Sequence, residues 1–238
     1  MEPGLVLRFA QPIRLVTLDA FHTLYTPVGG VGAHYATEIR KLGLPVTNEE
    51  VEVAFRKTYH KYTQLYPNYG YNQHMGSKRW WTNLVRDTFK RVGLARKERA
   101  SNAVFELFAT ARPYRVFPEC QRVLTELKQR NIAVGVVSNS DERTGELIQA
   151  LGLGQWTDFI LVSATFGFEK PAPQIFQEAL RLGHSAPENT LHVGDHREND
   201  YLAPKRLAMH SLLLDRRCSN ANRTPGVINN LEQIFEYI

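Results

Sequence analysis

The sequence predicts an α/β fold built around a parallel sheet, and the alternation of two apolar patterns indicates it. Short apolar and β-branched runs have the length and composition of buried strands. They lie at 13–18, 132–138, 158–163, 190–194 and 211–215. Before the later runs, apolar residues recur at helical spacing over 118–130, 141–151 and 173–182. Strands that alternate with helices are joined by βαβ crossovers, so we expect one parallel sheet.

The segment between the first and second predicted strands is too long for a crossover and has mostly helical patterns. Helices are predicted from Glu49, from about Ser77 and over about 98–110. Thr47 or Asn48 would cap the first of these helices. We therefore expect a core domain of residues 1–26 plus 114–238 and an inserted helical cap domain of residues 27–113.

Composition limits the classes of partner. The chain has 238 residues, of which 43% are hydrophobic, and a net charge of +5. The basic residues are scattered, which favours small anions over a nucleic-acid surface. No apolar stretch approaches the roughly 20 residues of a membrane span.

Cys120 and Cys218 are the only cysteines and lie far apart, as is common in a reducing compartment. We expect a cytoplasmic protein with a small substrate and neither nucleic-acid nor membrane partners. Nothing in the sequence indicates an oligomeric state.

Asp19 ends the first predicted strand, where a buried carboxylate is costly unless it is paired. Ligands of open α/β sheets bind at this carboxyl edge. A carboxylate there can act as a nucleophile and form a covalent ester, although Asp is also a common helix N-cap. Thr23 follows four residues later, and its hydroxyl is suited to orient the Asp19 carboxylate or to bind a substrate oxygen.

Later segments end strands or begin helices with matching chemistry. Ser138 and Asn139 offer a hydroxyl and backbone N–H groups for an anion, although Ser-Asn is also an ordinary turn. Lys170, followed by Pro171, is a cation that would neutralise a phosphate or a group of carboxylates.

Asp195 and Asp200 complete a set of carboxylates. Asp195 ends the fourth predicted strand, and Asp200 lies about one helical turn later. Together with Asp19 they would repel one another and any anionic substrate. A hard divalent cation with oxygen ligands removes both problems, so the sequence predicts a Mg²⁺ site.

These segments, in this order, resemble the haloacid dehalogenase-like hydrolase superfamily. The four motifs are RLVTLDAFHTL, VVSNSD, KPAPQIF and HVGDHREND. The resemblance implies a Rossmann-like sheet in the order 5-4-1-2-3, numbered along the chain, with helices on both faces. Within the predicted cap, the PNYG of Pro67–Gly70 followed by Trp80-Trp81 is similar to one subgroup of that superfamily.

The resemblance also implies roles for single residues. Asp19 would form an aspartyl-phosphate and ligate Mg²⁺. The backbone carbonyl of Phe21 and the side chain of Asp195 would be further ligands, and Asp200 would act through water or hold Lys170. The remaining roles concern the substrate, whose phosphoryl oxygens would meet Thr23, Ser138, Asn139 and Lys170.

One position departs from the pattern. Phosphatases of this superfamily carry an acid two residues after the nucleophile, and here that position is Phe21. General acid catalysis is typically worth about 10²–10⁴-fold, so poor leaving groups should react slowly. The neighbouring His22 is an alternative proton donor. The Asp-Ala-Phe sequence instead resembles 2-haloacid dehalogenases, which need no metal, yet Asp195 and Asp200 are retained.

Three functional hypotheses follow. The first is a Mg²⁺-dependent hydrolase of a small phosphorylated substrate. The second is a 2-haloacid dehalogenase, and the third is a protein that binds a phosphorylated ligand or partner with negligible turnover.

Aromatic residues of the predicted cap would either line a substrate slot or pack the cap, namely Tyr66, Tyr69, Tyr71, Trp80 and Trp81. Arg79 would bind a substrate carboxylate or face solvent.

Overall fold

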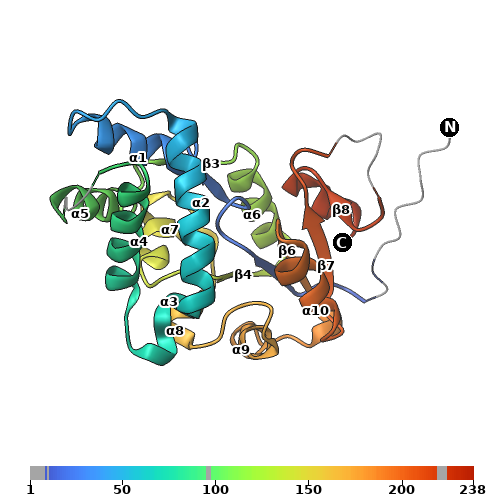
Figure 1. The fold of residues 1–238 in the computed structure, drawn as a ribbon. Coiled ribbons are helices and arrows are strands. Elements are labelled where there is room, and N and C mark those ends of the chain that lie inside the picture. Colours follow the sequence, from blue (N-terminus) through green and yellow to red (C-terminus); the bar gives the residue numbers. More distant parts are fainter. Residues whose placement is uncertain (1–8, 10, 95–97, 219–223) are drawn as a thin grey trace. The chain divides into compact units, whose positions relative to one another are not determined.

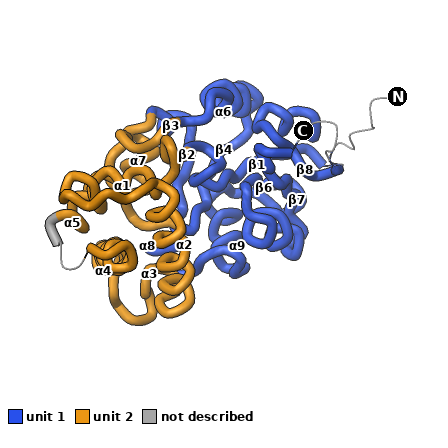
Figure 2. Tube along the Cα trace, turned by 45° about the horizontal axis from the view of Figure 1, so that its top comes forward, with its two compact units in different colours: residues 1–25, 116–139, 152–238 blue, residues 26–115, 140–151 orange. Residues whose placement is uncertain are grey.

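The chain divides into two compact units in the computed structural model, which describes residue 9 and residues 11–94, 98–218 and 224–238. The first unit comprises residues 1–25, 116–139 and 152–238, and the second comprises residues 26–115 and 140–151 (Figure 2). The assignment of 1–26 plus 114–238 to a core domain and of 27–113 to a cap domain stays a prediction.

The first unit contains a six-stranded sheet in which every pair of neighbours is parallel. In spatial order its strands are β5 (Phe159–Val162), β4 (Ala133–Ser138), β1 (Leu15–Leu18), β6 (Thr190–Gly194), β7 (His210–Leu214) and β8 (Val227–Ile228). This order confirms the predicted α/β fold and adds one edge strand. The β8 strand is only 2 residues long, too short for a period-2 pattern to reveal it.

Helices cover both faces of this sheet. The α6 helix (Cys120–Gln129) lies on one face and α9 (Pro173–Leu182) on the other (Figure 1). Each helix buries a stripe of apolar residues at helical spacing, Val123, Leu124 and Leu127 in α6 and Ile175, Phe176 and Ala179 in α9. Shorter elements complete the unit: α8 (Ser163–Phe166), α10 (Ala203–Lys205), the 3₁₀ helices η2 (Gly154–Trp156), η3 (Pro187–Asn189) and η6 (Leu231–Glu236), and the π-helix η4 (Arg197–Leu202).

The second unit is mainly helical. Its helices are α1 (Val31–Arg40), α2 (Asn48–Leu65), α3 (Pro67–Gly70), η1 (Tyr71–Gln73), α4 (Ser77–Arg91), α5 (Glu98–Leu107) and α7 (Thr144–Ala150). A buried cluster that includes Tyr35, Val51 and Phe89 packs α1, α2 and α4 together. Two short strands, β2 (Tyr25–Pro27) and β3 (Tyr114–Val116), pair where the chain passes between the units.

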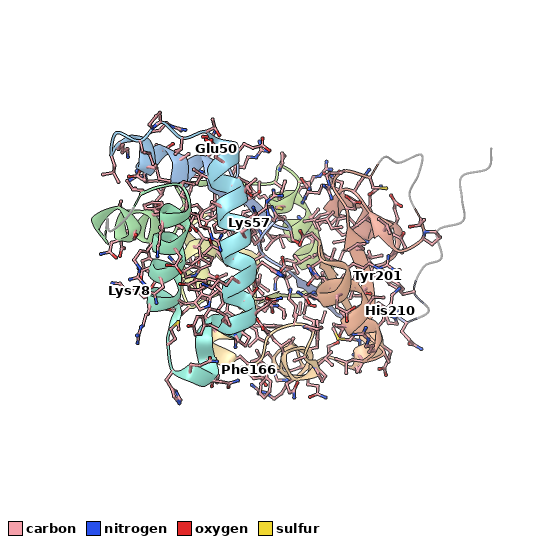
Figure 3. All side chains as sticks on the ribbon, in the orientation of Figure 1. Glu50, Lys57, Lys78, Phe166, Tyr201 and His210 are labelled. Atoms are coloured by element: carbon pink, nitrogen blue, oxygen red, sulfur yellow. The ribbon has the colours of Figure 1, made fainter. Side chains whose placement is uncertain are left out.

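A capping box begins α2. The Thr47 hydroxyl accepts from the backbone N–H of Glu50 at 3.1 Å, and the Glu50 carboxylate accepts from the backbone N–H of Thr47 at 2.8 Å. Glu50 lies in the first turn of this helix (Figure 3). Thr47 is therefore the N-cap, and the alternative of Asn48 was wrong. Within the described residues, no helix has the length and apolar character needed to cross a membrane.

Residues 140–151 belong to the helical unit because side chains bind them there. Asp141, which is buried, accepts a hydrogen bond from the Trp81 indole N–H at 2.7 Å. The Arg143 guanidinium donates to both Asp141 oxygens at 2.9 and 2.7 Å and to the Phe105 carbonyl at 3.0 Å. These bonds link the beginning of α7 to α4 and α5.

The aromatic residues of the second unit mostly pack against one another. Trp80 is 1% exposed and makes edge-to-face contacts with Tyr62, Tyr69 and Trp81. Its indole N–H donates to the Tyr66 carbonyl at 3.0 Å. For Trp80, these contacts favour the packing role over the substrate slot. Tyr71 and Arg79 are exposed.

Candidate active site

Lys170 joins two carboxylates at the carboxyl edge of the sheet in the first unit. Its ammonium donates to Asp19 Oδ1 at 2.8 Å, to Asp200 Oδ1 at 2.6 Å and to the Val137 carbonyl at 2.8 Å. These bonds account for all of its N–H groups. The side chain is only 2% exposed, so its position is fixed and its charge is shielded from solvent.

The register of the sheet places Asp19 beside the other motifs. Leu18 pairs with Val136 on β4 and with Val193 on β6, and the Asp19 N–H donates to the Val193 carbonyl at 2.9 Å. The three strands therefore end together, as the sequence predicts. The Thr23 hydroxyl donates to Asp19 Oδ2 at 3.3 Å, which fits its predicted role in orienting the carboxylate.

Asp200 reaches this edge from the π-helix η4. Such helices often occur at functional sites. Its Oδ2 atom accepts from the His196 backbone N–H at 2.9 Å, and its side chain is 1% exposed. Burial opposes ionisation of Asp200, but the Lys170 charge and the His192 hydrogen bond outweigh it and hold its pKa below the ordinary value.

Ser138 and Asn139 lie at the end of β4. Ser138 is 2% exposed. The Asn139 carboxamide donates to the Lys170 carbonyl at 2.7 Å and accepts from the Lys170 N–H at 2.7 Å. This reciprocal pair fixes the backbone of the lysine against the end of β4. Roles of Ser138 and Asn139 toward a phosphoryl group stay predictions.

The carboxylates of Asp19, Asp195 and Asp200 form one cluster. One oxygen from each lies within 4.8 Å of the others. Asp195 is exposed, whereas Asp19 is buried. Burial raises the pKa of Asp19 despite Lys170, and partial desolvation followed by the Asp200 charge raises the pKa of Asp195. One ammonium does not balance these carboxylates, and a hard divalent cation would stabilise their ionised forms. The donor set therefore fits Mg²⁺.

Phe21 stands at the position where an acid was expected by resemblance. Its side chain is half-buried, and its ring packs edge-on against the exposed His22, with centroids 4.3 Å apart. His22 has a φ of 63°, in the left-handed region. A phenyl ring has no proton to donate, so the site lacks an acid at this position.

Sequence reasoning missed three residues that are bonded to the candidate site directly or through a neighbour. Thr17 and His192 form a buried hydrogen-bonded pair in neighbouring strands, and His192 also contacts Asp200. The sequence did hold a sign of both residues, since each is a polar residue within an otherwise apolar strand pattern.

Arg216 is the third missed residue. It donates to the His22 carbonyl at 3.3 Å and to the Thr23 carbonyl at 2.8 Å, and it pairs with Glu119 at 2.6 Å. It thereby holds the loop that follows Asp19. No local pattern could have indicated these contacts.

A family model for haloacid dehalogenase-like hydrolases matches residues 13–207. The chain belongs to the haloacid dehalogenase-like hydrolase family. The human haloacid dehalogenase-like hydrolase domain-containing protein 3 is 36% identical over 205 residues, which cover 85% of this chain and 82% of the relative. The rhythmically expressed gene 2 protein of Drosophila melanogaster is 34% identical, with 89% and 86% covered. The first of these relatives confirms the subgroup that the PNYG and Trp-Trp residues indicated.

Solved structures support the haloacid dehalogenase-like fold. The L-2-haloacid dehalogenase RSc1362 has a TM-score of 0.75 at 19% identity, and 95% of this chain and 98% of that chain are covered. A HAD-hydrolase from Bacillus subtilis bound to magnesium has a TM-score of 0.71 at 15% identity, with 95% and 98% covered. At these identities the likeness concerns the fold alone.

Proposed function

We propose that this protein is a Mg²⁺-dependent hydrolase that acts on a small phosphorylated metabolite through an aspartyl-phosphate. The observation that carries the proposal is the cluster of Asp19, Asp195 and Asp200, whose oxygens lie within 4.8 Å of one another beside the buried Lys170. A nucleophilic carboxylate, a fixed cation and a set of oxygen ligands for a metal ion suit phosphoryl transfer through an aspartyl-phosphate.

Asp19, Asp195 and the backbone carbonyl of Phe21 would hold Mg²⁺ directly, and Asp200 would hold it through water. When bound, the cation would neutralise negative charge on the phosphoryl group. The magnesium bound to the B. subtilis hydrolase of similar fold supports this choice. Thr23 and Lys170 each bond one oxygen of Asp19 and so fix its orientation for attack.

The chemistry proceeds in two displacements at phosphorus. An Asp19 oxygen forms a bond to phosphorus, and the bond to the leaving oxygen breaks with its electron pair. The oxygen of a water then forms a bond to phosphorus, the bond from phosphorus to Asp19 breaks with its electron pair left on the carboxylate, and phosphate leaves with the protons of the water. Ser138 and the Asn139 backbone N–H would bind the phosphoryl oxygens, together with Lys170. Since Phe21 gives no proton, leaving oxygens that are stable as anions should depart fastest.

The test compares aryl and acyl phosphates with an alkyl phosphate, each with Mg²⁺ and with chelator. The proposal expects turnover of the first two that requires Mg²⁺ and is absent in Asp19→Asn. Turnover of the alkyl phosphate should be lower by about 10²–10⁴-fold. Equal rates in chelator, or full activity of Asp19→Asn, would refute the proposal.

A 2-haloacid dehalogenase is the second candidate. The sequence Asp19-Ala20-Phe21 and the fold shared with an L-2-haloacid dehalogenase favour it, because halide leaves without a proton. Release of halide from a chlorinated or brominated short acid in chelator would support it. The retained Asp195 and Asp200 support the phosphatase instead.

A binding protein with negligible turnover is the third candidate, and Phe21 is the observation that favours it. Thermal stabilisation by a phosphorylated ligand with no product would distinguish it from an enzyme. For each of these three candidate functions we expect a cytoplasmic protein without nucleic-acid or membrane partners. The two cysteines, which lie far apart in the sequence, agree with a reducing compartment.

A further inference from the structure

His192 occupies the middle of β6 and is fully buried. Thr17 lies directly opposite on β1, and the Thr17 hydroxyl is 2.8 Å from His192 Nδ1. The other ring nitrogen, Nε2, is 3.1 Å from Asp200 Oδ1. The imidazole therefore joins the centre of the sheet to a carboxylate of the candidate active site.

The chemistry of the partners determines which nitrogen carries the proton. Ionised Asp200 only accepts hydrogen bonds, so Nε2 of His192 must donate. A neutral ring has one donor and one acceptor nitrogen, which matches a carboxylate on one side and a hydroxyl on the other. Nδ1 is then an acceptor, and the Thr17 hydroxyl donates to it. Each nitrogen thus has a partner, as a buried polar ring requires.

The acceptor positions of Asp200 are largely used. Oδ1 accepts from Lys170 at 2.6 Å and from His192, and Oδ2 accepts from the His196 N–H at 2.9 Å. A carboxylate oxygen takes about two such bonds, so Oδ1 is saturated and Oδ2 has room for one further donor, such as water. His192 thereby fixes which oxygen of Asp200 faces Lys170.

We propose that His192, held by Thr17, is a positioning residue that orients Asp200 so that Lys170 bridges it to Asp19. The inference rests on the proposed function of this site. It adds to that function two residues from the interior of the sheet, His192 and Thr17. Removing a partner that orients a catalytic or metal-binding group in this way typically lowers activity or metal affinity by about 10–100-fold. The alternative is a core histidine that contributes only to stability.

Three variants separate positioning from packing. His192→Leu removes the donor, His192→Gln retains one near Nε2, and Thr17→Val removes the hydroxyl while keeping the side-chain shape. Mg²⁺ affinity is measured by titration with the metal alone, and kcat and KM are measured with an aryl phosphate, below the melting temperature of every variant.

We expect His192→Leu to lose about 10–100-fold in Mg²⁺ affinity or kcat with little change in KM, and His192→Gln to recover most of it. Thr17→Val should show a smaller loss in the same direction. Folded His192→Leu with wild-type affinity and kcat would overturn the proposal.

Nitrogen-15 NMR of the histidine rings tests the hydrogen bonds without any turnover. We expect the His192 ring in the wild-type protein to carry a proton on Nε2, and Thr17→Val to shift the Nδ1 signal. A wild-type ring whose Nε2 carries no proton would overturn the proposal. This measurement also tests the proposal if His192→Leu fails to fold. If the wild-type protein neither binds Mg²⁺ nor turns over phosphates, the proposed function fails, whereas the NMR result still judges the orientation of Asp200.

Discussion

Gly194 and Asp200 approach so closely that no side chain fits between them. A Cβ atom on Gly194 would lie well inside van der Waals contact with the carboxyl carbon of Asp200. The end of β6 therefore needs glycine for a reason of space, because Asp200 folds back over it to reach Lys170.

We expect Gly194→Ala to displace Asp200 and to lower Mg²⁺ affinity or turnover by about 10–100-fold. Gly145 is the matched control, since it lies within α7 and a Cβ atom added there would meet no atom within 4 Å beyond its chain neighbours and its own helix backbone. Gly145→Ala should leave both properties unchanged. Titration with Mg²⁺ and kinetics on an aryl phosphate check the pair, and wild-type values for Gly194→Ala would contradict this interpretation.

Lys170 balances two buried carboxylates, so its removal should cost stability as well as activity. We expect Lys170→Met to lower the free energy of unfolding by about 3–5 kcal/mol, because Asp19 and Asp200 lose their shared partner. Lys128→Met breaks an exposed pair with Asp158 and should cost at most about 1 kcal/mol. Urea denaturation measures both, and equal losses would argue against a buried, fixed Lys170.

Arg216 should matter through the backbone that it holds. We expect Arg216→Gln to lower stability by about 1.5–3 kcal/mol, because it loses charged bonds to Glu119 and to the Thr23 carbonyl. If the Phe21 carbonyl binds Mg²⁺, affinity for the metal should fall as well. Glu119→Gln is the control, since it keeps the Arg216 bonds to the loop carbonyls. Equal Mg²⁺ affinities in the two variants would show that Arg216 does not act through this loop.

The bond from Trp81 to Asp141 should govern how firmly α7 is held. Trp81→Phe keeps a ring but removes the indole N–H, which donates to a buried carboxylate. We expect a loss of about 1.5–3 kcal/mol and faster hydrogen exchange in residues 140–151. Unchanged exchange there would indicate that the other bonds of this segment, from Arg143 and from Ser77 to Glu142, retain it without Trp81.

The two thiols should differ in reactivity. Cys120 is fully buried, and burial raises the pKa of its thiol to about 12, whereas Cys218 is half-buried. Because the thiolate is the reactive form, we expect an alkylating reagent at pH 8 to modify Cys218 and to reach Cys120 only on unfolding. Mass spectrometry of Cys218→Ser, which should remain unmodified when folded, checks the assignment. Rapid labelling of that variant would contradict it.

The parts of the fold that follow from local patterns were predictable. Apolar runs that end at Asp19, Ser138 and Gly194 indicated the strands and their shared edge, and the register then brought Asp19 next to Lys170 and Asp200.

Long-range pairings were not predictable in this way. Thr17 and His192 each look like an ordinary strand residue until the register places them opposite each other. The grouping of 140–151 with the helical unit likewise depends on Trp81, which is far away in sequence.

The decisive test of Asp19 as nucleophile and of the metal site beside it is a structure of the protein with Mg²⁺ and beryllofluoride. We expect beryllium bonded to an Asp19 oxygen, with Mg²⁺ held by Asp19 and Asp195 and with Lys170 still bridging Asp19 and Asp200. A structure in which Asp19 carries no beryllium and no cation lies among these carboxylates would contradict it.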